Sequence, residues 1–217
     1  MNRLTQKLIL QGGAGAIEAV RDEPTQVDGQ APRGVALIAH PHPLFGGTMD
    51  NKVVQTLARA FVQCGWVAVR FNFRGVGASE GVHDAGRGEL DDFLAVVQQC
   101  APQGPLALAG FSFGSFVMSH AVTALHDRRP LEKLVFVGTA TSRFDVANLP
   151  TALHERSLVI HGEEDDTVPL ASVMDWARPQ YLPVTVIPAV AHFFHGQLPL
   201  LKSLVVRHLL SPVAAVA

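Results

Sequence analysis

The feature that most constrains the fold is an alternation of apolar runs and helical segments from residue 34 onward. Apolar residues recur at intervals of three and four in the helical segments, as on one face of a helix. Strands that are nearly continuous in apolar residues and separated by such helices indicate a parallel sheet covered on both faces. The predicted strands are 35–39, 67–71, 106–110, 131–137, 158–161 and 184–187, and the predicted helices are 53–62, 90–97, 112–126, 170–178 and 197–210.

The N-terminal part of the sequence has a different pattern. Residues 4–10 and 16–21 are predicted as two short strands on either side of the turn Gly12-Gly13-Ala14-Gly15, which indicates an antiparallel hairpin. Residues 22–33 are polar, include two prolines and are predicted as a surface loop. No internal repeat, linker or low-complexity segment interrupts the pattern, so we expect one α/β domain over residues 1–217.

The composition limits the classes of partner and compartment. The 217 residues include 17 Lys and Arg against 19 Asp and Glu, without a basic run, which argues against nucleic-acid binding. No segment reaches about 18 uninterrupted apolar residues, so we expect no membrane span. The first residues lack an apolar core of signal-peptide length. Cys64 and Cys100 have no metal-ligand spacing and are expected to be buried, reduced thiols at helix ends, which favours a cytoplasmic protein.

The pentapeptide Gly110-Phe111-Ser112-Phe113-Gly114 lies between a predicted strand and a predicted helix. In this context Gly-x-Ser-x-Gly is typical of a nucleophile elbow, a turn so tight that the serine takes a strained backbone conformation and exposes its hydroxyl above the sheet. The alternative is an ordinary strand-to-helix turn, because small residues occur in many turns. We interpret Ser112 as a candidate nucleophile.

A serine nucleophile needs a base, and the base needs an orienting carboxylate. The loop after the predicted strand 158–161 contains Asp165 and Asp166. This loop follows the carboxyl end of a strand, where open parallel sheets place their sites. We expect Asp165 to be the orienting acid and keep Asp166 as the second choice. Without a catalytic role, these acidic residues would simply cap the next helix.

The base is expected after the last predicted strand, where two histidines, His192 and His195, follow each other closely. His192 is nearer to the strand end, so a short loop can direct it over Ser112, whereas His195 is expected to begin or face the final helix. A histidine in such an apolar segment is otherwise a packed core residue. The order Ser112, Asp165, His192 favours the catalytic interpretation, because it is the chain order of the α/β-hydrolase triad.

Acyl transfer also needs N–H donors for the developing oxyanion, and the loss of one donor typically costs about 10²–10³ in rate. The residue after the nucleophile, Phe113, is expected to supply the first donor. The loop 40–47, after the first predicted parallel strand, is expected to supply the second. Its two prolines are excluded because proline has no N–H. His42 is the first choice by its distance past the strand end, and Leu44 is the fallback.

His40 and His42 have a second interpretation as a pair of metal ligands, because imidazole is a common ligand. No suitably spaced Asp, Glu or further His accompanies them before His83. We therefore expect no metal and no cofactor. The glycine-containing loop 72–81 is expected to be structural, with Arg74 anchoring it near the floor of the site.

These motifs resemble the α/β-hydrolase superfamily over nearly the whole chain. The segments that match the superfamily are the pentapeptide around Ser112, the loops that contain Asp165 and His192, and the loop 72–81. More narrowly, Ala39-His40-Pro41-His42-Pro43-Leu44 with residues 46–52 is similar to a family of small bacterial serine hydrolases related in style to dienelactone hydrolases.

Two differences narrow what the resemblance implies. Dienelactone hydrolases use cysteine at the elbow, where this chain has Ser112. Relatives with a helical lid insert it after the sixth strand, but only about 19 residues, 138–156, separate the two predicted strands here. The resemblance therefore implies an open site without a large lid.

The resemblance implies a carboxylesterase-type serine hydrolase that acts on small acyl esters through Ser112, Asp165 and His192. Phe45 and Phe193 are expected to line the substrate-binding surface, together with Phe113 and Phe194. A thioesterase, an aminopeptidase or an acyltransferase would use the same triad. A non-catalytic binding protein on this fold is the alternative from another class. The natural substrate and the oligomeric state stay open.

Overall fold

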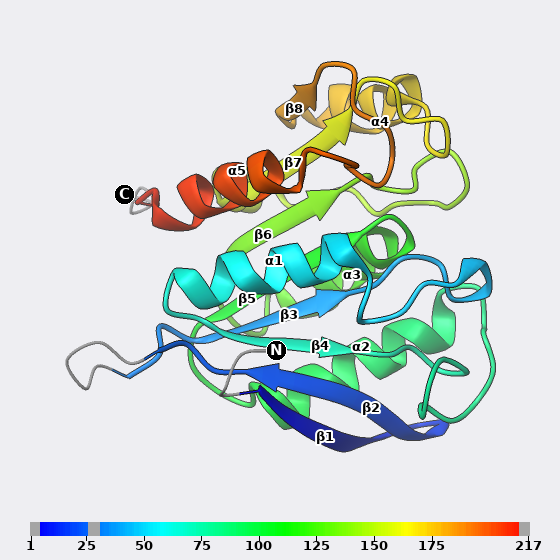
Figure 1. Cartoon of the computed structure of the whole chain (residues 1–217), viewed down its shortest axis with the longest axis vertical. Helices are drawn as coiled ribbons and strands as arrows, with labels where there is room; N and C mark the ends of the chain where they lie inside the picture. Colours follow the sequence, from blue (N-terminus) through cyan, green and yellow to red (C-terminus); the bar gives the residue numbers. More distant parts are fainter. Residues whose placement is uncertain (1–4, 26–30, 213–217) are drawn as a thin grey trace.

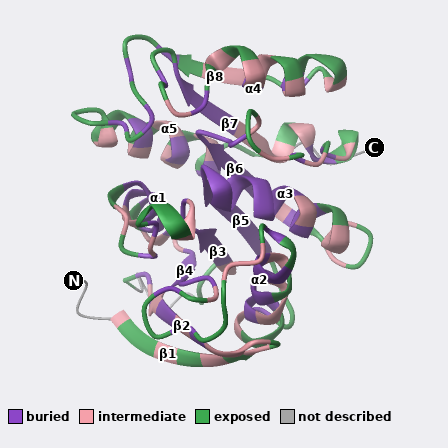
Figure 2. Ribbon diagram, turned by 90° about the vertical axis from the view of Figure 1, so that its right-hand side faces the viewer, coloured by how far each residue is buried: buried purple, intermediate pink, exposed green. Residues whose placement is uncertain are grey.

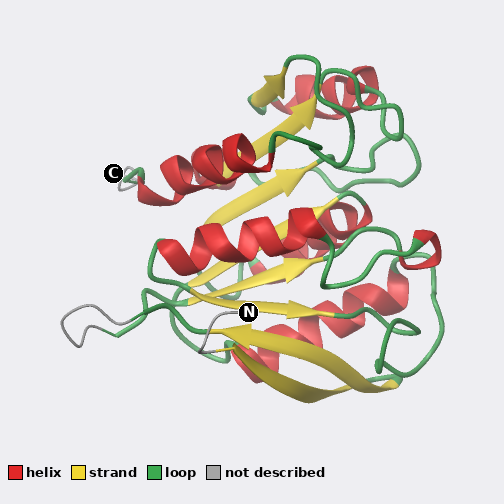
Figure 3. Ribbon diagram, in the orientation of Figure 1, coloured by secondary structure: helices red, strands yellow, loops and turns green. Residues whose placement is uncertain are grey.

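Eight strands form one sheet in the computed structural model, which describes residues 5–25 and 31–212 (Figures 1 and 3). The sheet order is β1-β2-β4-β3-β5-β6-β7-β8, with β2 antiparallel to both of its neighbours and β3 to β8 parallel to one another. This confirms the predicted α/β sheet with an antiparallel hairpin at one edge. The strands are β1 (Thr5–Gly12), β2 (Gly15–Asp22), β3 (Val35–Ala39), β4 (Val67–Phe71), β5 (Leu106–Phe111), β6 (Leu131–Val137), β7 (Ser157–Gly162) and β8 (Val184–Ile187).

The N-terminal hairpin is longer than its sequence pattern indicates. Its strands pair from Thr5 opposite Asp22 to Gly12 opposite Gly15, so the turn has only two residues. The predicted first residue, Leu4, lies outside the described residues, as does part of the predicted loop 22–33. The hairpin joins the parallel strands through the β2–β4 pairing.

Helices cover both faces of the sheet, as the sequence predicts (Figure 2). On one face, α1 and α5 pack on a core cluster that includes Phe61 and Leu201. On the other, α2, α3 and α4 pack on a second cluster, which includes Phe93, Val117 and Val173. None of the described helices is long and apolar enough to cross a membrane. The helices are α1 (Lys52–Gln63), α2 (Arg87–Cys100), α3 (Phe113–Leu125), α4 (Leu170–Ala177) and α5 (Leu198–Leu210).

The local sequence determines where helix α1 begins and which of its faces packs on the sheet. Asn51 is its N-cap, and the Asn51 side-chain oxygen accepts the N–H of Val53 at 2.9 Å. Val53, Leu57 and Phe61 follow at helical spacing and are all buried against the sheet. The cap therefore holds Asn51 at the edge of the sheet where the parallel strands end.

No lid follows β6. The chain continues through the loop 138–150 and a short 3₁₀ helix, Thr151–Arg156, directly into β7. The loops after β3, β5, β6, β7 and β8 all start at the carboxyl edge of the parallel strands, where they surround one region (Figure 1). This edge is where the site is expected.

The two cysteines lie at helix ends, as predicted. Cys64 caps the C-terminus of α1 and is buried, whereas Cys100 is the last residue of α2 and is only half-buried. Both are free thiols, and burial raises the pKa of each. The expectation of two buried thiols is therefore corrected for Cys100, since the end of α2 leaves one side of it open.

Candidate active site

Ser112 lies in the tight turn between β5 and α3. Its backbone takes φ 56° and ψ −117°, a conformation that L-residues rarely adopt and that costs on the order of 1–3 kcal/mol. The two flanking glycines allow the turn to close. A Cβ at Gly110 would lie 2.6 Å from the Gly114 carbonyl carbon, and a Cβ at Gly114 would lie 2.5 Å from the carbonyl oxygen of Ala39. The turn therefore has the geometry of a nucleophile elbow.

We expect Gly114→Ala to lower the free energy of unfolding by about 1–3 kcal/mol, because the new methyl group would overlap the backbone of β3. Urea unfolding followed by circular dichroism measures the change. The matched control is Gly13→Ala, because a Cβ at Gly13 would meet nothing within 4 Å. Equal midpoints for the two variants would contradict the steric argument.

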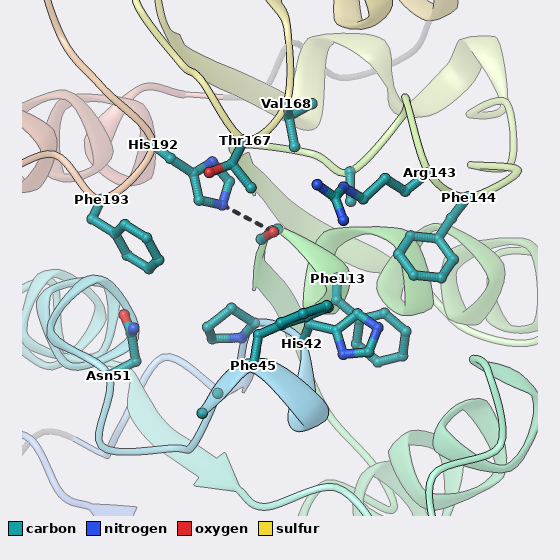
Figure 4. A pocket seen from close by; sticks show the side chains of 15 residues that line it. His42, Phe45, Asn51, Phe113, Arg143, Phe144, Thr167, Val168, His192 and Phe193 are labelled. Atoms are coloured by element: carbon teal, nitrogen blue, oxygen red, sulfur yellow. Dashed lines mark hydrogen bonds between the residues drawn. The ribbon is translucent and has the colours of Figure 1, made fainter.

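His192 connects Ser112 to Asp165. Its Nδ1 lies 2.6 Å from Asp165 Oδ2, and its Nε2 lies 3.0 Å from Ser112 Oγ (Figure 4, dashed line). A carboxylate only accepts hydrogen bonds, so Nδ1 carries the ring proton and donates to Asp165. Nε2 is then the acceptor for the Ser112 hydroxyl. All three side chains are buried, and they come from the loops after β5, β7 and β8.

The Asp165 carboxylate is fixed on both of its oxygens. Oδ1 accepts the backbone N–H groups of Thr167 at 3.0 Å and Val168 at 2.7 Å, while Oδ2 faces His192. His161 donates from Nε2 to the Val168 carbonyl at 2.9 Å, and the same nitrogen lies 3.4 Å from Asp165 Oδ2. Burial lowers the pKa of His161, so this second imidazole adds a neutral dipole beside the carboxylate. These contacts set the direction in which Asp165 points.

Asp166 and His195, the second choices for the orienting acid and the base, do not contact Ser112, Asp165 or His192 through hydrogen bonds. Asp166 is exposed, and its Oδ1 accepts the hydroxyl of Thr167 at 3.3 Å. His195 is exposed, and its ring stacks on Phe193 with centroids 6.1 Å apart. The geometry thus brings together the first choices, Asp165 and His192, with Ser112.

The candidate oxyanion donors differ in whether their N–H groups are free. Phe113 is the first residue of α3, where the N–H has no acceptor inside the helix. The Leu44 N–H donates to Nδ1 of His42 at 3.2 Å, so it is already used. The His42 N–H donates to no described residue. The geometry therefore favours His42 over Leu44 as the partner of Phe113.

His40 has a structural role at the base of the same loop. Its Nε2 accepts the N–H of Phe73 at 3.0 Å, so Nδ1 carries the proton and donates to the Pro41 carbonyl at 2.6 Å. With both nitrogens occupied, His40 does not pair with His42 as a metal ligand. Among residues 5–25 and 31–212, no three His, Cys, Asp or Glu side chains are grouped to hold a metal ion.

The burial of His40 predicts a pH dependence of stability. Burial lowers the pKa of His40 from 6.5 to about 4 and that of His208 to the same value. Between these pH values the unfolded chain binds more protons than the folded chain, so the free energy of unfolding falls as the pH drops from 6.5 to 4. For His40 the fall is about 3 kcal/mol at most.

Urea unfolding at several pH values between 7 and 4 measures this slope. We expect His40→Asn to be less stable at pH 7, because the Phe73 N–H loses its acceptor, and to show a shallower slope than the wild type. The control is His195→Asn, since the His195 side chain is exposed. An unchanged slope in His40→Asn would contradict the argument.

The loop 72–81 does not line the cavity, but its contacts hold neighbouring segments in place. Arg74 forms a two-bond ion pair with Asp92, at 3.0 and 2.8 Å, which confirms the predicted anchor. At the start of the loop, Asn72 Oδ1 accepts the N–H of Met49 at 2.8 Å. This bond ties the loop 72–81 to the segment that precedes α1.

A cavity of about 320 Å³ opens in front of Ser112 (Figure 4). Phe45, Phe113 and Phe193, which are expected from the sequence to contact the substrate, all line this cavity. The expectation for Phe194 is wrong. Phe194 has φ 52° and is fully buried in the core under α1 and α5, because this turn sends the two adjacent aromatic rings in different directions.

Several residues that line the cavity carry no local signal in the sequence that predicts their place there. Asn51 is held there by its capping role, and Thr167 and Val168 by their bonds to Asp165. Arg143 and Phe144 come from the loop after β6. The position of that loop after a parallel strand could have indicated them, since such loops meet at one edge of the sheet.

A family model described as serine aminopeptidase, S33 (Hydrolase_4), matches residues 30–158. XC6422 from Xanthomonas campestris, described as an α/β serine hydrolase without lid, is 33% identical, with 99% of each chain covered and a TM-score of 0.85. An α-β serine hydrolase homologue from Coxiella burnetii is 36% identical, with 95% of this chain and 97% of that chain covered and a TM-score of 0.78.

One curated relative matches a shorter segment. The uncharacterized protein RP471 from Rickettsia prowazekii is 41% identical over 100 residues. The match spans 44% of this chain and 40% of that protein, which is less than half of either.

Proposed function

Since this chain belongs to the α/β serine hydrolases of the α/β-hydrolase superfamily, we propose that it is a carboxylesterase-type enzyme that cleaves small acyl esters through Ser112. The observation that carries the proposal is the pair of bonds on His192, 3.0 Å to Ser112 Oγ and 2.6 Å to Asp165 Oδ2. A serine, a base and an orienting carboxylate in this arrangement are what nucleophilic acyl transfer requires.

In the proposed reaction, Ser112 Oγ attacks the ester carbonyl while His192 Nε2 takes the hydroxyl proton. The carbonyl oxygen becomes an oxyanion, which the N–H groups of Phe113 and His42 stabilise. His192 then protonates the departing alcohol, leaving an acyl group on Ser112. A water molecule, deprotonated by His192, hydrolyses this acyl-enzyme and restores the serine. Asp165 keeps the imidazole in the required tautomer and stabilises it when it is charged.

The lining of the cavity supports ester cleavage over aminopeptidase activity, the activity in the name of the matching family model. An aminopeptidase must bind a free α-ammonium group, and a carboxylate is the natural partner for that charge. The residues that line this cavity include no Asp or Glu. Arg143 also lines the cavity, and its positive guanidinium repels an ammonium group. The rest of the lining is largely aromatic and apolar, which suits the hydrocarbon part of an acyl ester.

Hydrolysis rates on a matched panel test the proposal. The panel contains 4-nitrophenyl esters from acetate to decanoate, an acyl thioester and alanine 4-nitroanilide. We expect kcat/KM to be highest for short and medium esters, because the cavity is small and open. Turnover of the anilide at a rate equal to the best ester would support the aminopeptidase instead, and a preference for the thioester would identify a thioesterase.

A further inference from the structure

Arg143 brings a positive charge into a cavity whose lining is largely aromatic and apolar. It lies in the loop after β6, in the place where lidded relatives would insert a lid. Figure 4 shows its guanidinium turned into the cavity, on the side opposite Phe193 and Asn51. No carboxylate from the cavity lining offsets this charge.

The backbone that carries Arg143 is fixed. The N–H groups of Arg143 and Phe144 both point to the carbonyl of Ala140, at 3.2 Å each, so the loop forms a tight turn. The Phe144 ring stacks on Phe116 of α3, with centroids 4.7 Å apart and an interplanar angle of 15°. The turn and the stacked ring hold the base of the Arg143 side chain beside the cavity.

The guanidinium itself has no partner within the described part of the chain. By contrast, six other arginines in the described residues each form an ion pair with a nearby carboxylate. A guanidinium offers five N–H donors and binds carboxylates through two parallel bonds. The arginines with a carboxylate partner are Arg21, Arg70, Arg74, Arg87, Arg156 and Arg178.

The charge also lies close to the candidate oxyanion donor. Burial is the main cause that lowers the pKa of the His42 ring, and His83 lowers it further; Glu89 opposes these effects, and the Arg143 charge adds a smaller lowering effect. His42 and Arg143 line the same cavity as Ser112. A substrate whose carbonyl is held at Ser112 therefore has Arg143 within the same small space.

We propose that Arg143 binds a carboxylate group of the substrate, so that the preferred substrates are esters that carry a free carboxylate on the acyl or the alcohol part. This inference rests on the proposed esterase function and names the substrate class of that site. The aromatic walls pack on the hydrocarbon part of such a molecule, and the guanidinium binds its charged end. Arg143 is thus a specificity-determining residue and takes no part in the bond-breaking steps.

Two matched ester pairs test the proposal. The acyl pair is 4-nitrophenyl hydrogen adipate and its methyl ester, and the alcohol pair is 4-acetoxybenzoate and its methyl ester. In each pair the two molecules differ in one charge. We expect the wild type to prefer the anionic member of at least one pair, and Arg143→Gln to lower the anionic-to-neutral ratio of kcat/KM by about 10–100-fold. Most of this change should appear in KM.

Two further variants separate charge from structure. Arg143→Lys should keep part of the preference, because lysine retains the charge but not the two parallel bonds. Arg128→Gln removes another exposed arginine, which lies beyond the end of α3 and outside the cavity, and should keep the wild-type ratio. Raised salt should reduce the wild-type preference, since the guanidinium is open to solvent.

The outcomes distinguish this inference from the proposed function. If the esters are hydrolysed but Arg143→Gln leaves both ratios unchanged, the carboxylate inference is overturned and the esterase proposal stands. If the wild type hydrolyses no ester, the esterase proposal fails, and titration calorimetry with adipate then tests Arg143 alone. Adipate binding that is lost in Arg143→Gln supports the carboxylate site, whereas equal binding, or none to the wild type, overturns it.

Discussion

Ser112→Ala is expected to lower kcat for 4-nitrophenyl ester hydrolysis by about 10⁶-fold, because it removes the oxygen that attacks the carbonyl. The fold should survive the change. The substitution removes the hydrogen bond between Ser112 Oγ and His192. It adds no backbone strain, because alanine at φ 56° is no more strained than serine. Steady-state kinetics give the loss in kcat, and thermal unfolding checks that the variant is folded.

The matched control for this prediction is Ser142→Ala. Ser142 is exposed and lies on the loop beside the cavity, but its hydroxyl is not among the cavity-lining groups. We expect its kcat to stay within a factor of two or so of the wild type. A Ser112→Ala variant that keeps more than about a hundredth of the wild-type kcat would show that another group performs the attack.

Asp165→Asn is expected to lower kcat by about 10⁴-fold with little change in KM. The backbone N–H groups of Thr167 and Val168 require an acceptor at Oδ1, so the amide oxygen takes that position. The NH₂ group then faces His192 Nδ1, which must accept instead of donate. The ring proton moves to Nε2, where it points at Ser112 Oγ and prevents the imidazole from acting as a base.

Asp166→Asn is the control for this second prediction, because Asp166 is the adjacent, exposed carboxylate. We expect it to change kcat by less than about twofold, as for most exposed side chains. If Asp166→Asn caused the larger loss, the orienting acid would be misassigned. Thermal unfolding of both variants separates a loss of catalysis from a loss of fold.

The parts of the fold that the sequence predicts best are those with strong local patterns. The strands at 35–39, 67–71, 131–137 and 184–187 have the predicted bounds, since each is a short, largely apolar run in the sequence. Helix α3 begins one residue later than predicted, because Ser112 itself is the strained residue that precedes it. The arrangement of Ser112, Asp165 and His192 follows from their places at the carboxyl ends of three strands.

The residues that the sequence does not place lie in loops without periodicity. Phe193 and Phe194 are adjacent and chemically identical, and only the positive φ of Phe194 sends one ring to the cavity and the other to the core. Arg143 lies in the irregular segment between β6 and β7, where no spacing indicates its direction. The contact of His161 with Asp165 depends on how the loop after β7 curls back, which no local pattern predicts.

The central claim is that Ser112 is an activated nucleophile, and reaction with a fluorophosphonate tests it most directly. Intact-protein mass spectrometry should show one phosphonyl adduct on the wild type, and peptide mapping should locate it on Ser112. The adduct should be absent from Ser112→Ala and should form much more slowly in Asp165→Asn. An unlabelled wild type, or a label of equal extent on Ser112→Ala, would contradict the account.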